Sequence, residues 1–342
     1  MMTTFSIDHI DMFLIALPDP AIVVDENGII ISANDHANDL FQDSTIGKHM
    51  TVALRAPVII QAVSEATSQS KSARVQYLVR TPVSRNYDVI VSALAGGLAL
   101  VMLRDVTYEE QIERMRSDFV ANASHELRTP LASLTGFIET MQGAAKNDAQ
   151  AKNGFLKLMK AQADRMARLI DDLLSLSRIE ISEHVQPTGI ADLALITNQI
   201  RDLLFSVAVE SSCTFKIDVP ASLPILGDAD QLSQVVHNLV ENAIKYSGNG
   251  KTVVVHGRIE NHEVVLSVRD DGPGIAAHHV PRLTERFYRV NVQDSRNRGG
   301  TGLGLAIAKH IINRHRGKLV IESELGTGSV FTIRLPLQKN SL

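Results

Sequence analysis

A histidine beside a glutamate is the residue pair in this chain most able to do chemistry. His125 and Glu126 lie in the run SHELRTP (124–130). A neutral imidazole nitrogen is a competent nucleophile, and an adjacent carboxylate can accept the proton of the other ring nitrogen, which makes the attacking nitrogen more electron-rich. The pair alone is equally compatible with a surface histidine in a charged helix. The run is one residue short of a zinc protease signature, because Thr129 stands where the second histidine is required.

Pro130 follows closely in a segment with helical periodicity. Proline lacks a backbone donor and clashes with the carbonyl of Glu126, four residues back, at a cost of about 3 kcal/mol in a straight helix. If the segment is helical, Leu127 points to an apolar seam, so His125 and Thr129 share a stripe that faces outward. The histidine is therefore predicted to be accessible beside a strained turn.

A second set of polar residues occupies one stripe of a helix predicted at 230–246. Asn238, Asn242 and Lys245 fall at positions i, i+4 and i+7, and the apolar residues fall on another side. Mg²⁺ takes oxygen ligands and usually keeps water, so two amide oxygens beside an ammonium suit a hydrated Mg²⁺ and its nucleotide phosphates. A solvated helix face explains the same pattern if this helix is considered alone.

Three glycine strings follow: DDGPG (270–274), GGTGLG (299–304) and GTG (326–328). The first ends a predicted strand, the second leads into a predicted helix, and the third turns between the last two strands. Glycine lets the backbone approach a ligand closely, and a helix N-terminus offers free N–H groups to phosphate oxygens. Asp270 could accept a hydrogen bond from the exocyclic amino group of adenine.

Two familiar nucleotide motifs are excluded by their context. The Gly302-x-Gly304 part of the second string lacks the third glycine of a dinucleotide fingerprint, and it does not open the first strand-turn-helix of a domain. The string GKT (250–252) imitates the end of a P-loop, but Lys245 stands where the first glycine belongs, and a strand follows where a helix should. A β-turn explains this string.

The residues after Pro187 must form the element pattern that positions these strings. Helical and strand-like patterns alternate there, which predicts one layered α/β domain with helices on one face of a mixed sheet. We expect helices at 192–209, 230–246 and 303–315, and strands at 215–219, 252–260, 263–269, 318–323 and 329–335.

The segment 107–182 has the heptad spacing of a helical hairpin. Apolar side chains recur at alternating steps of four and three on both sides of a turn at 143–148. The seam residues are Leu127, Leu131, Leu134, Ile138 and Met141 before the turn, and Phe155, Met159, Gln162, Met166, Leu169, Leu173 and Leu176 after it. A lone hairpin can hardly hide both seams, so pairing of two copies into a four-helix bundle is predicted. Packing of the hairpin on its neighbouring domains alone is the alternative.

The N-terminal segment, to about residue 106, has the pattern of a small α+β domain. Two β-branched runs, 21–25 and 28–32, flank an Asn-Gly turn, a short helix is expected at 34–41, and strands are expected at 74–81, 87–93 and 98–103. His36 and His49 could bind haem or a metal, but lone histidines usually do neither.

Length and composition limit the class of protein. A chain of 342 residues predicts two or three domains, and its 34 basic and 38 acidic residues create no positive field for nucleic acid. The single cysteine, Cys213, cannot form an internal disulfide, so a reducing compartment is expected. The longest apolar stretch, 92–103, is shorter than the roughly 20 residues of a membrane span. We expect a cytoplasmic protein as the chain stands, which a longer parent could tether to the inner membrane.

Taken in order, the strings resemble the transmitter core of bacterial two-component sensor histidine kinases. The resemblance covers about 107–337, and the phrases SHELRTPLASLTGFIETM and LTERFYRV resemble the phosphate-regulon sensor kinases most. The N-terminal run PDPAIVVDENGIIISANDHANDLF resembles the start of a PAS sensor domain. The matching strings are FVANASHELRTPLASL (H box), HNLVENAIKYS (N box), DDGPGI (first glycine box), ERFYRV (F box), GGTGLGLAI (second glycine box) and GTGSVF (third glycine box).

This resemblance implies a multidomain α+β fold with three parts. These are a PAS-like sensor at 1–106, a dimerising hairpin that carries the phospho-accepting histidine at 107–182, and an α/β-sandwich ATP-binding domain at 187–342. It implies that His125 accepts a phosphoryl group, that Glu126 is its acid/base partner and that Thr129 orients water for dephosphorylation of a response regulator. The residues implied for ATP are Asn238, Lys245, Tyr246, Asp270, Gly272, Gly274, Phe287, Gly300, Thr301, Gly302, Leu303 and Gly304, with Asn242 as ligand of Mg²⁺ and 276–298 as a lid.

The implied activity is a protein-histidine kinase that uses Mg²⁺ and ATP and signals phosphate starvation. The expected partners are a response regulator, a second copy of the chain and an unknown sensor ligand or upstream partner. A clamp-type ATPase with the same nucleotide-binding fold, or a non-catalytic dimeric adaptor, is the alternative. The first has no use for a phospho-accepting histidine, and the second needs no Mg²⁺ site. The stimulus, the regulator and transfer within or across subunits stay open.

Overall fold

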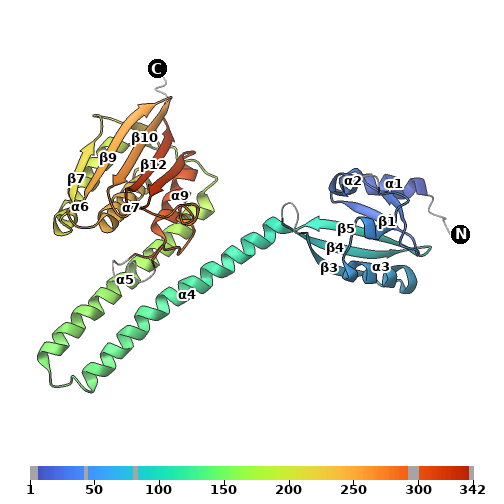
Figure 1. The fold of residues 1–342 in the computed structure, drawn as a ribbon, viewed down its shortest axis with the longest axis horizontal. Helices are drawn as coiled ribbons and strands as arrows, with labels where there is room; N and C mark the ends of the chain where they lie inside the picture. Colours follow the sequence, from blue (N-terminus) through green and yellow to red (C-terminus); the bar gives the residue numbers. More distant parts are fainter. Residues whose placement is uncertain (1–6, 42–44, 80–83, 292–299, 339–342) are drawn as a thin grey trace. The chain divides into compact units, whose positions relative to one another are not determined.

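The computed structural model describes residues 7–41, 45–79, 84–291 and 300–338, and it divides the chain into two compact units, Met1–Asp118 and Phe119–Leu342. The division falls inside a long helix, α4 (Figure 1). The predicted boundary at residue 106 is not the same as this division and stays a prediction. Among the described residues, no helix combines the length and apolar character that crossing a membrane requires.

The first unit is built on an antiparallel five-stranded sheet with strand order β2-β1-β5-β4-β3. Its core lies between this sheet and helix α3, where Val89 and Val101 from the central strands are fully buried. The elements are α1 (Ile7–Ile15), β1 (Ala21–Val24), β2 (Ile30–Ala33), α2 (Asp35–Phe41), the 3-10 turn η1 (Met50–Val52), α3 (Pro57–Gln69), β3 (Ala73–Val79), β4 (Arg85–Leu94) and β5 (Leu98–Asp105).

Two long helices, α4 (Thr107–Gln142) and α5 (Ala149–Ser182), form the predicted hairpin. The turn between them ends at Asp148, whose side chain accepts a hydrogen bond from the backbone of Ala151 and caps α5. The rings of Phe137 and Phe155 lie 5.7 Å apart across the hairpin. Pro130 lies inside α4, so the helix continues through it without the hydrogen bond to the Glu126 carbonyl.

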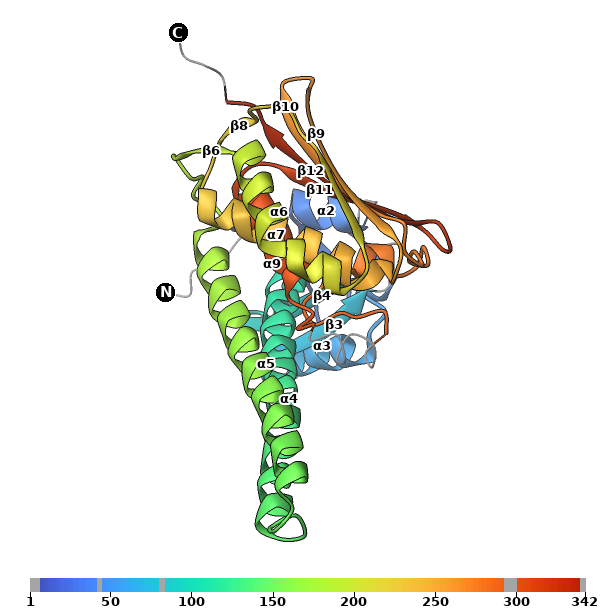
Figure 2. The ribbon, with the colours of Figure 1, turned by 90° about the vertical axis from the view of Figure 1, so that its left-hand side faces the viewer.

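The α/β lobe, residues 190–338, has a five-stranded mixed sheet with order β11-β12-β10-β9-β7, in which only the β7–β9 pair is parallel among the described strands. Figure 2 shows α6, α7 and α9 on one face of this sheet. The elements are β6 (Ile190–Asp192), α6 (Leu193–Glu210), β7 (Thr214–Asp218), β8 (Pro224–Leu226), α7 (Ala229–Ser247), β9 (Thr252–Glu260), β10 (Glu263–Asp270), the 3-10 turn η2 (Val280–Arg282), α9 (Gly304–Arg314), β11 (Lys318–Glu324) and β12 (Gly328–Pro336).

One continuous core joins the α/β lobe to the C-terminal half of α5. Leu232, Leu239 and Ile307 from α7 and α9 are almost fully buried against the sheet, and Leu169 and Leu176 of α5 belong to the same cluster. Burial of these side chains from water is the main force that assembles the lobe. The C-terminal end of the predicted seam on α5 is therefore already covered within one chain.

The α+β class and the mixed sheet are confirmed, and every helix and strand predicted from the sequence is present with ends shifted by one or two residues. The last residues of the strand expected at 74–81 lie outside the described residues. The sequence analysis missed α1, α3 and the short strands β6 and β8. The last two have only three residues each, too few for a periodic pattern.

Candidate functional site

A cavity of about 640 Å³ opens in the α/β lobe between α7, α9 and the glycine strings. This volume falls in the range of small-molecule and cofactor pockets. The predicted residues that line it are Asn238, Asn242, Lys245, Tyr246, Asp270, Gly274, Gly300, Thr301, Gly302 and Gly304. Of the other predicted residues, Gly272, Phe287 and Leu303 lie beside the wall but are not part of it, as judged from the described part of the chain. Ten predicted residues from separate strings therefore meet around one space.

Helix α7 forms the polar wall of the cavity. The Asn238 amide donates a 3.2 Å hydrogen bond to the carbonyl of Gly304, which ties α7 to the first turn of α9. Lys245 forms a 2.9 Å ion pair with Glu241 one turn away on the same helix. Asn242 lines the cavity between them, on the stripe that the sequence predicts. Its side-chain amide carries an oxygen, which is the kind of ligand that a hydrated Mg²⁺ takes.

Asp270 lies at the end of β10 with only 5% of its surface exposed. Its carboxylate accepts a 2.9 Å hydrogen bond from the backbone N–H of Gly272. Burial raises the pKa of Asp270, the charge of Asp271 raises it further, and the bonds to Gly272 and Ser329 offset part of this effect. An acceptor held in so dry a place can discriminate strongly between ligands that do and do not donate to it.

The first and third glycine strings touch each other. A Cβ atom on Gly274 would lie 1.9 Å from the Glu324 carbonyl oxygen, and one on Gly328 would lie 2.1 Å from the Asp270 carbonyl oxygen. The backbone N–H of Gly326 donates a 2.7 Å hydrogen bond to the carbonyl of Pro273. Close approach of backbone to backbone therefore requires glycine here, independently of any ligand.

The second glycine string rests on the F-box segment. The backbone N–H of Phe287 donates a 2.8 Å hydrogen bond to the carbonyl of Gly302. Phe287 has a φ of 64°, which is unusual for a bulky residue, and a Cβ on Gly302 would lie 2.9 Å from its Cα. The Leu303 side chain is fully buried in the core of the lobe. The predicted lid at 276–298 lies partly outside the described residues.

His125 lies on α4 with an exposed side chain, and Thr129 one turn later is exposed too. The Thr129 hydroxyl donates a 3.2 Å hydrogen bond to the His125 carbonyl. The neighbouring Glu126 is only 13% exposed and forms ion pairs with Arg165 of α5 at 3.0 Å and Arg289 at 3.1 Å. None of the three predicted catalytic residues lines the cavity within the described chain, but Arg289 does. Arg289 thus links the segment that carries His125 to the cavity.

Helix α5 adds a wall that the sequence analysis did not predict. Arg168, Asp171 and Asp172 line the cavity, and the Thr301 hydroxyl donates a 2.6 Å hydrogen bond to the Asp172 carboxylate. Asp172 and Thr301 are far apart in the sequence, so no local spacing could show the contact.

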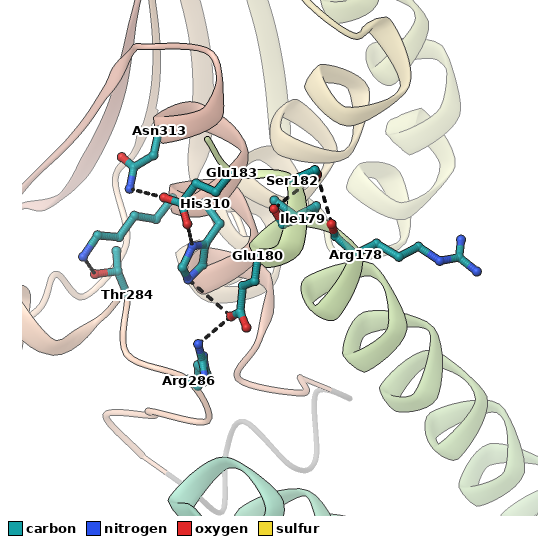
Figure 3. A network of polar contacts seen from close by, with 10 residues as sticks. Arg178, Ile179, Glu180, Ser182, Glu183, Thr284, Arg286, His310 and Asn313 are labelled. Atoms are coloured by element: carbon teal, nitrogen blue, oxygen red, sulfur yellow. Dashed lines mark hydrogen bonds and ion pairs between the residues drawn. The ribbon is translucent and has the colours of Figure 1, made fainter. Parts of the chain in front are cut away.

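A second polar contact joins the end of α5 to α9 (Figure 3). Glu183 accepts hydrogen bonds from the His310 ring at 2.8 Å and from the Asn313 amide at 3.1 Å. Glu180, one turn earlier, forms an ion pair with Arg286 at 2.5 Å. Burial alone would raise the pKa of Glu183, but the bonds from His310 and Asn313 outweigh it and lower the pKa.

The first unit holds a smaller cavity of about 250 Å³. Its walls are mostly apolar, with Thr45, Lys48, Tyr77 and Tyr87 as polar groups. His36 is exposed on α2, and the His49 ring contacts the Thr51 hydroxyl at 2.8 Å. Neither histidine lines this cavity among the residues that the structure describes.

Comparison with protein families gives two matches. Residues 115–181 match the His Kinase A (phospho-acceptor) domain, and residues 227–339 match the histidine kinase-, DNA gyrase B-, and HSP90-like ATPases. The first match contains the predicted H box, and the second contains the N box and all three glycine boxes.

Curated relatives are named as sensor kinases. The phosphate regulon sensor protein PhoR of Pseudomonas aeruginosa is 38% identical over 233 residues, which are 68% of this chain and 53% of that protein. The sensor protein kinase WalK of Staphylococcus saprophyticus is 32% identical over 341 residues, which are 96% of this chain and 55% of that protein. The chain thus spans about half the length of the curated relatives that it matches.

Solved structures share the fold. The histidine kinase AdeS of Acinetobacter baumannii is 25% identical with a TM-score of 0.51, over 63% of this chain and 98% of that chain. The histidine kinase ThkA, solved in complex with the response regulator protein TrrA, is 20% identical with a TM-score of 0.52, over 95% of this chain and 98% of that chain.

Proposed function

Because this chain belongs to the bacterial two-component sensor histidine kinases, we propose that it transfers the γ-phosphoryl group of ATP to His125 and then to an aspartate of a response regulator. The observation that carries this proposal is the pairing of two sites in one unit. An exposed histidine lies on α4, and a nucleotide-sized cavity lies in the α/β lobe.

The residues around the cavity suit an adenine nucleotide. Asp270 accepts a hydrogen bond from the exocyclic amino group of adenine, and Gly272 and Gly274 shape the loop beside it. Lys245 and Tyr246 contact ribose or phosphate, and the segment from Gly300 to Gly304 meets the phosphates at the start of α9, where backbone N–H groups favour anions. The buried Nε of Arg289 lacks a hydrogen-bond partner among the described residues, which also fits an anionic ligand.

Asn242 would hold Mg²⁺, with Asn238 fixing the loop beside it through Gly304. When bound, the ion neutralises phosphate charge. Lys245 adds positive charge on the same stripe of α7. All of these residues position the nucleotide rather than react with it, as expected for phosphoryl transfer.

In the transfer step, a ring nitrogen of His125 forms a bond to the γ-phosphorus while the bond to the β,γ-bridging oxygen breaks and ADP leaves. Glu126 accepts the proton of the other ring nitrogen. Glu126 is held by Arg165 and Arg289 in this structure, and His125 does not line the cavity within the described residues. The lobe must therefore move relative to the hairpin before transfer, and the helix turn at Pro130 is the pivot that we propose.

After transfer, His125 has to meet a receiver domain. Its exposure on α4, with Thr129 exposed one turn later, leaves room for a partner on this stripe. Thr129 would orient water when the regulator is dephosphorylated.

A second copy of the chain would complete the hairpin. Leu131 and Ile138, both predicted seam residues, are 54% and 40% exposed, and Leu156 and Leu174 of α5 are 54% and 52% exposed. Exposed leucine and isoleucine side chains along both helices of one hairpin are unusual for a monomer and are hidden in a four-helix bundle.

The N-terminal unit would be the sensor, of the PAS kind, with its boundary near residue 106 and the hairpin and ATP domain at 107–182 and 187–342. Its cavity is the place for a small ligand. The likeness to PhoR supports phosphate starvation as the stimulus. The level of phosphorylated His125 in cells grown with and without inorganic phosphate tests this.

The alternatives of a clamp ATPase or an adaptor are not favoured, because residues 115–181 match a phospho-acceptor family that neither would need. Incubation with γ-labelled ATP and Mg²⁺ tests the choice. The wild-type chain should acquire acid-labile, base-stable label, and His125→Gln should lose all of it while still binding ATP. His36→Gln, at another exposed histidine, is the matched control and should label normally.

Asn242→Ala should lose both the label and the Mg²⁺-dependent part of nucleotide affinity. Isothermal titration with ADP, with and without Mg²⁺, measures that part directly. Label on a folded His125→Gln protein would contradict the assignment of the acceptor. Unchanged Mg²⁺ dependence in Asn242→Ala would contradict the assignment of the metal ligand.

A further inference from the structure

A carboxylate of the hairpin lies at the loop where nucleotide phosphates are expected. Asp172 extends from α5 into the wall of the large cavity, and the Thr301 hydroxyl donates a 2.6 Å hydrogen bond to it. Thr301 is in the second glycine string, directly before Gly302 and the start of α9. The same hydroxyl accepts a 3.3 Å hydrogen bond from the backbone of Leu303. Asp172 therefore contacts the loop itself and not a remote part of the lobe.

The surroundings of Asp172 are electrostatically unfavourable for a second anion. Asp171 lines the same cavity, as does Glu241 of α7. Burial raises the pKa of Asp172, and the charges of Asp171 and Glu241 raise it further, while Thr301 and Arg168 act in the opposite direction. Glu241 is paired with Lys245 at 2.9 Å. Asp171 and Asp172, with the nearby guanidinium of Arg168, still leave this side of the cavity with an excess of negative charge.

The loop that Asp172 contacts lies at the start of α9, where nucleotide phosphates are expected to bind. Helix α9 begins at Gly304, and its free N–H groups and dipole favour an anion at this end. A di- or triphosphate carries several negative charges, and like charges in a partly buried site repel each other with little screening. The Asp172 carboxylate and the phosphates of a nucleotide would therefore compete for the same loop.

We propose that Asp172 is an internal competitor for nucleotide phosphates, so that the lobe docked on α5 binds ATP weakly and ATP binding releases the second glycine string from α5. This inference rests on the proposed function, because it takes ATP as the ligand of the cavity. It assigns to a hairpin residue a part in setting nucleotide affinity, and it makes that part depend on phosphate charge rather than on adenine.

The docked arrangement has other contacts that hold it together. The Glu180–Arg286 and Glu183–His310 pairs join α5 to the lobe away from Thr301, and Glu126 binds Arg289. Since Arg289 also lines the cavity, a nucleotide that draws Arg289 to its phosphates would loosen a second contact. Nucleotide loading and release of Arg289 from Glu126 would then occur together, and Glu126, beside His125, would keep its ion pair with Arg165 of the hairpin.

The test compares ligands of increasing phosphate charge on the full chain. Affinities for adenosine, ADP and the non-hydrolysable ATP analogue AMPPNP, the last two with Mg²⁺, are measured by isothermal titration for wild type and Asp172→Asn. Asparagine keeps the size of the side chain and its acceptor for Thr301, and removes only the charge. Asp164→Asn is the matched control, because Asp164 is an exposed aspartate of the same helix that pairs with Lys160 and does not line the described cavity.

In Asp172→Asn we expect AMPPNP to bind about tenfold more tightly and ADP about threefold more tightly, the size of a partly screened repulsion. Adenosine should bind as in wild type, and Asp164→Asn should change none of the three affinities. If Asp172→Asn perturbs the fold, Asp172→Ala takes its place, provided that its thermal unfolding midpoint equals that of wild type. It should show the same order of affinity gains, with AMPPNP first, ADP second and adenosine unchanged.

Equal effects on all three ligands, or weaker AMPPNP binding in both folded variants, would overturn the competitor role while leaving the kinase assignment intact. Failure of every protein to bind any of the ligands would overturn both, since the cavity would then not be a nucleotide site.

Discussion

The α/β lobe and the helical hairpin bury their apolar side chains in opposite ways. In the lobe, helices α7 and α9 and the sheet enclose a continuous core that is complete within one chain. On the hairpin, α4 buries only Pro130 and α5 buries Leu169, Leu176 and Ile179, among the residues that the structure describes. Those three belong to the lobe's core. The proposed nucleotide site is therefore built on a self-sufficient scaffold, whereas His125, the proposed acceptor, lies on a scaffold that one chain leaves half covered.

The largest effect is expected where the hairpin is incomplete. The double variant Ile138→Asn, Leu156→Asn should raise the dimer dissociation constant at least about 100-fold, because each buried side chain contributes roughly 1.5–3 kcal/mol and each occurs twice. Analytical ultracentrifugation measures this. Leu325→Asn, at an exposed leucine in the turn between β11 and β12, is the control and should leave association unchanged. Equal association of the double variant and wild type would show that the hairpin does not pair through these rows.

The next effect separates binding from stability inside the lobe. Asp270→Asn should weaken ADP binding by roughly tenfold or more, since it removes a charged acceptor. Because burial raises the pKa of Asp270 above 3.8, the ionised group costs stability, and this cost appears as the pH rises through the raised pKa. The variant should therefore gain on the order of 1 kcal/mol in unfolding free energy at pH 7.

Urea unfolding of the second unit at pH 7 and in acid checks this sign. The gain in Asp270→Asn should shrink as the pH falls toward 3.8, where wild-type Asp270 is protonated. If Asp270→Asn lowered the free energy of unfolding at pH 7 by as much as it weakened the free energy of ADP binding, Asp270 would be mainly structural.

The smallest effect concerns the contact between the two regions at Glu183. Its lowered pKa means that the contact stabilises the fold above pH 4.5 and loses this contribution as the pH falls through the lowered value. Glu183→Gln should cost about 1 kcal/mol or less at pH 6 and nothing in stronger acid. Urea midpoints at both pH values measure the difference, and a cost that persists in acid would assign the contact to packing alone.

The same two regions differ in how far the sequence predicts them. The helices and strands of the lobe have long periodic patterns. The spacing of Asn238 and Asn242 alone also fits a solvated helix face, and the resemblance of the strings, taken in order, is what implies a nucleotide site shared with Asp270. The heptad pattern predicts the hairpin, but Leu169 and Leu176, the seam residues near the C-terminal end of α5, pack on the lobe of the same chain. The row that stays exposed on α5, with Leu156 and Leu174, lies one residue further along the helix.

The contacts that the sequence does not predict are those between regions. Asp172 meets Thr301, and Glu126 meets Arg289, across separations at which helical and strand periodicity carry no information. In the first unit, α3 was missed because its apolar run, PVIIQAV, fits a strand or a helix equally well, and Pro57 at its first turn is the only local signal of a helix.

The close packing of Gly274 against Glu324, and of Gly328 against Asp270, limits which substitutions evolution can accept at these two glycines. Two strings that look like separate ligand loops are one joint of the sheet, so a side chain gained at either glycine would damage the edge of the lobe whether or not nucleotide is present. Drift at these positions is therefore limited by assembly of the joint as well as by catalysis. A descendant that had abandoned ATP would still be expected to retain both glycines.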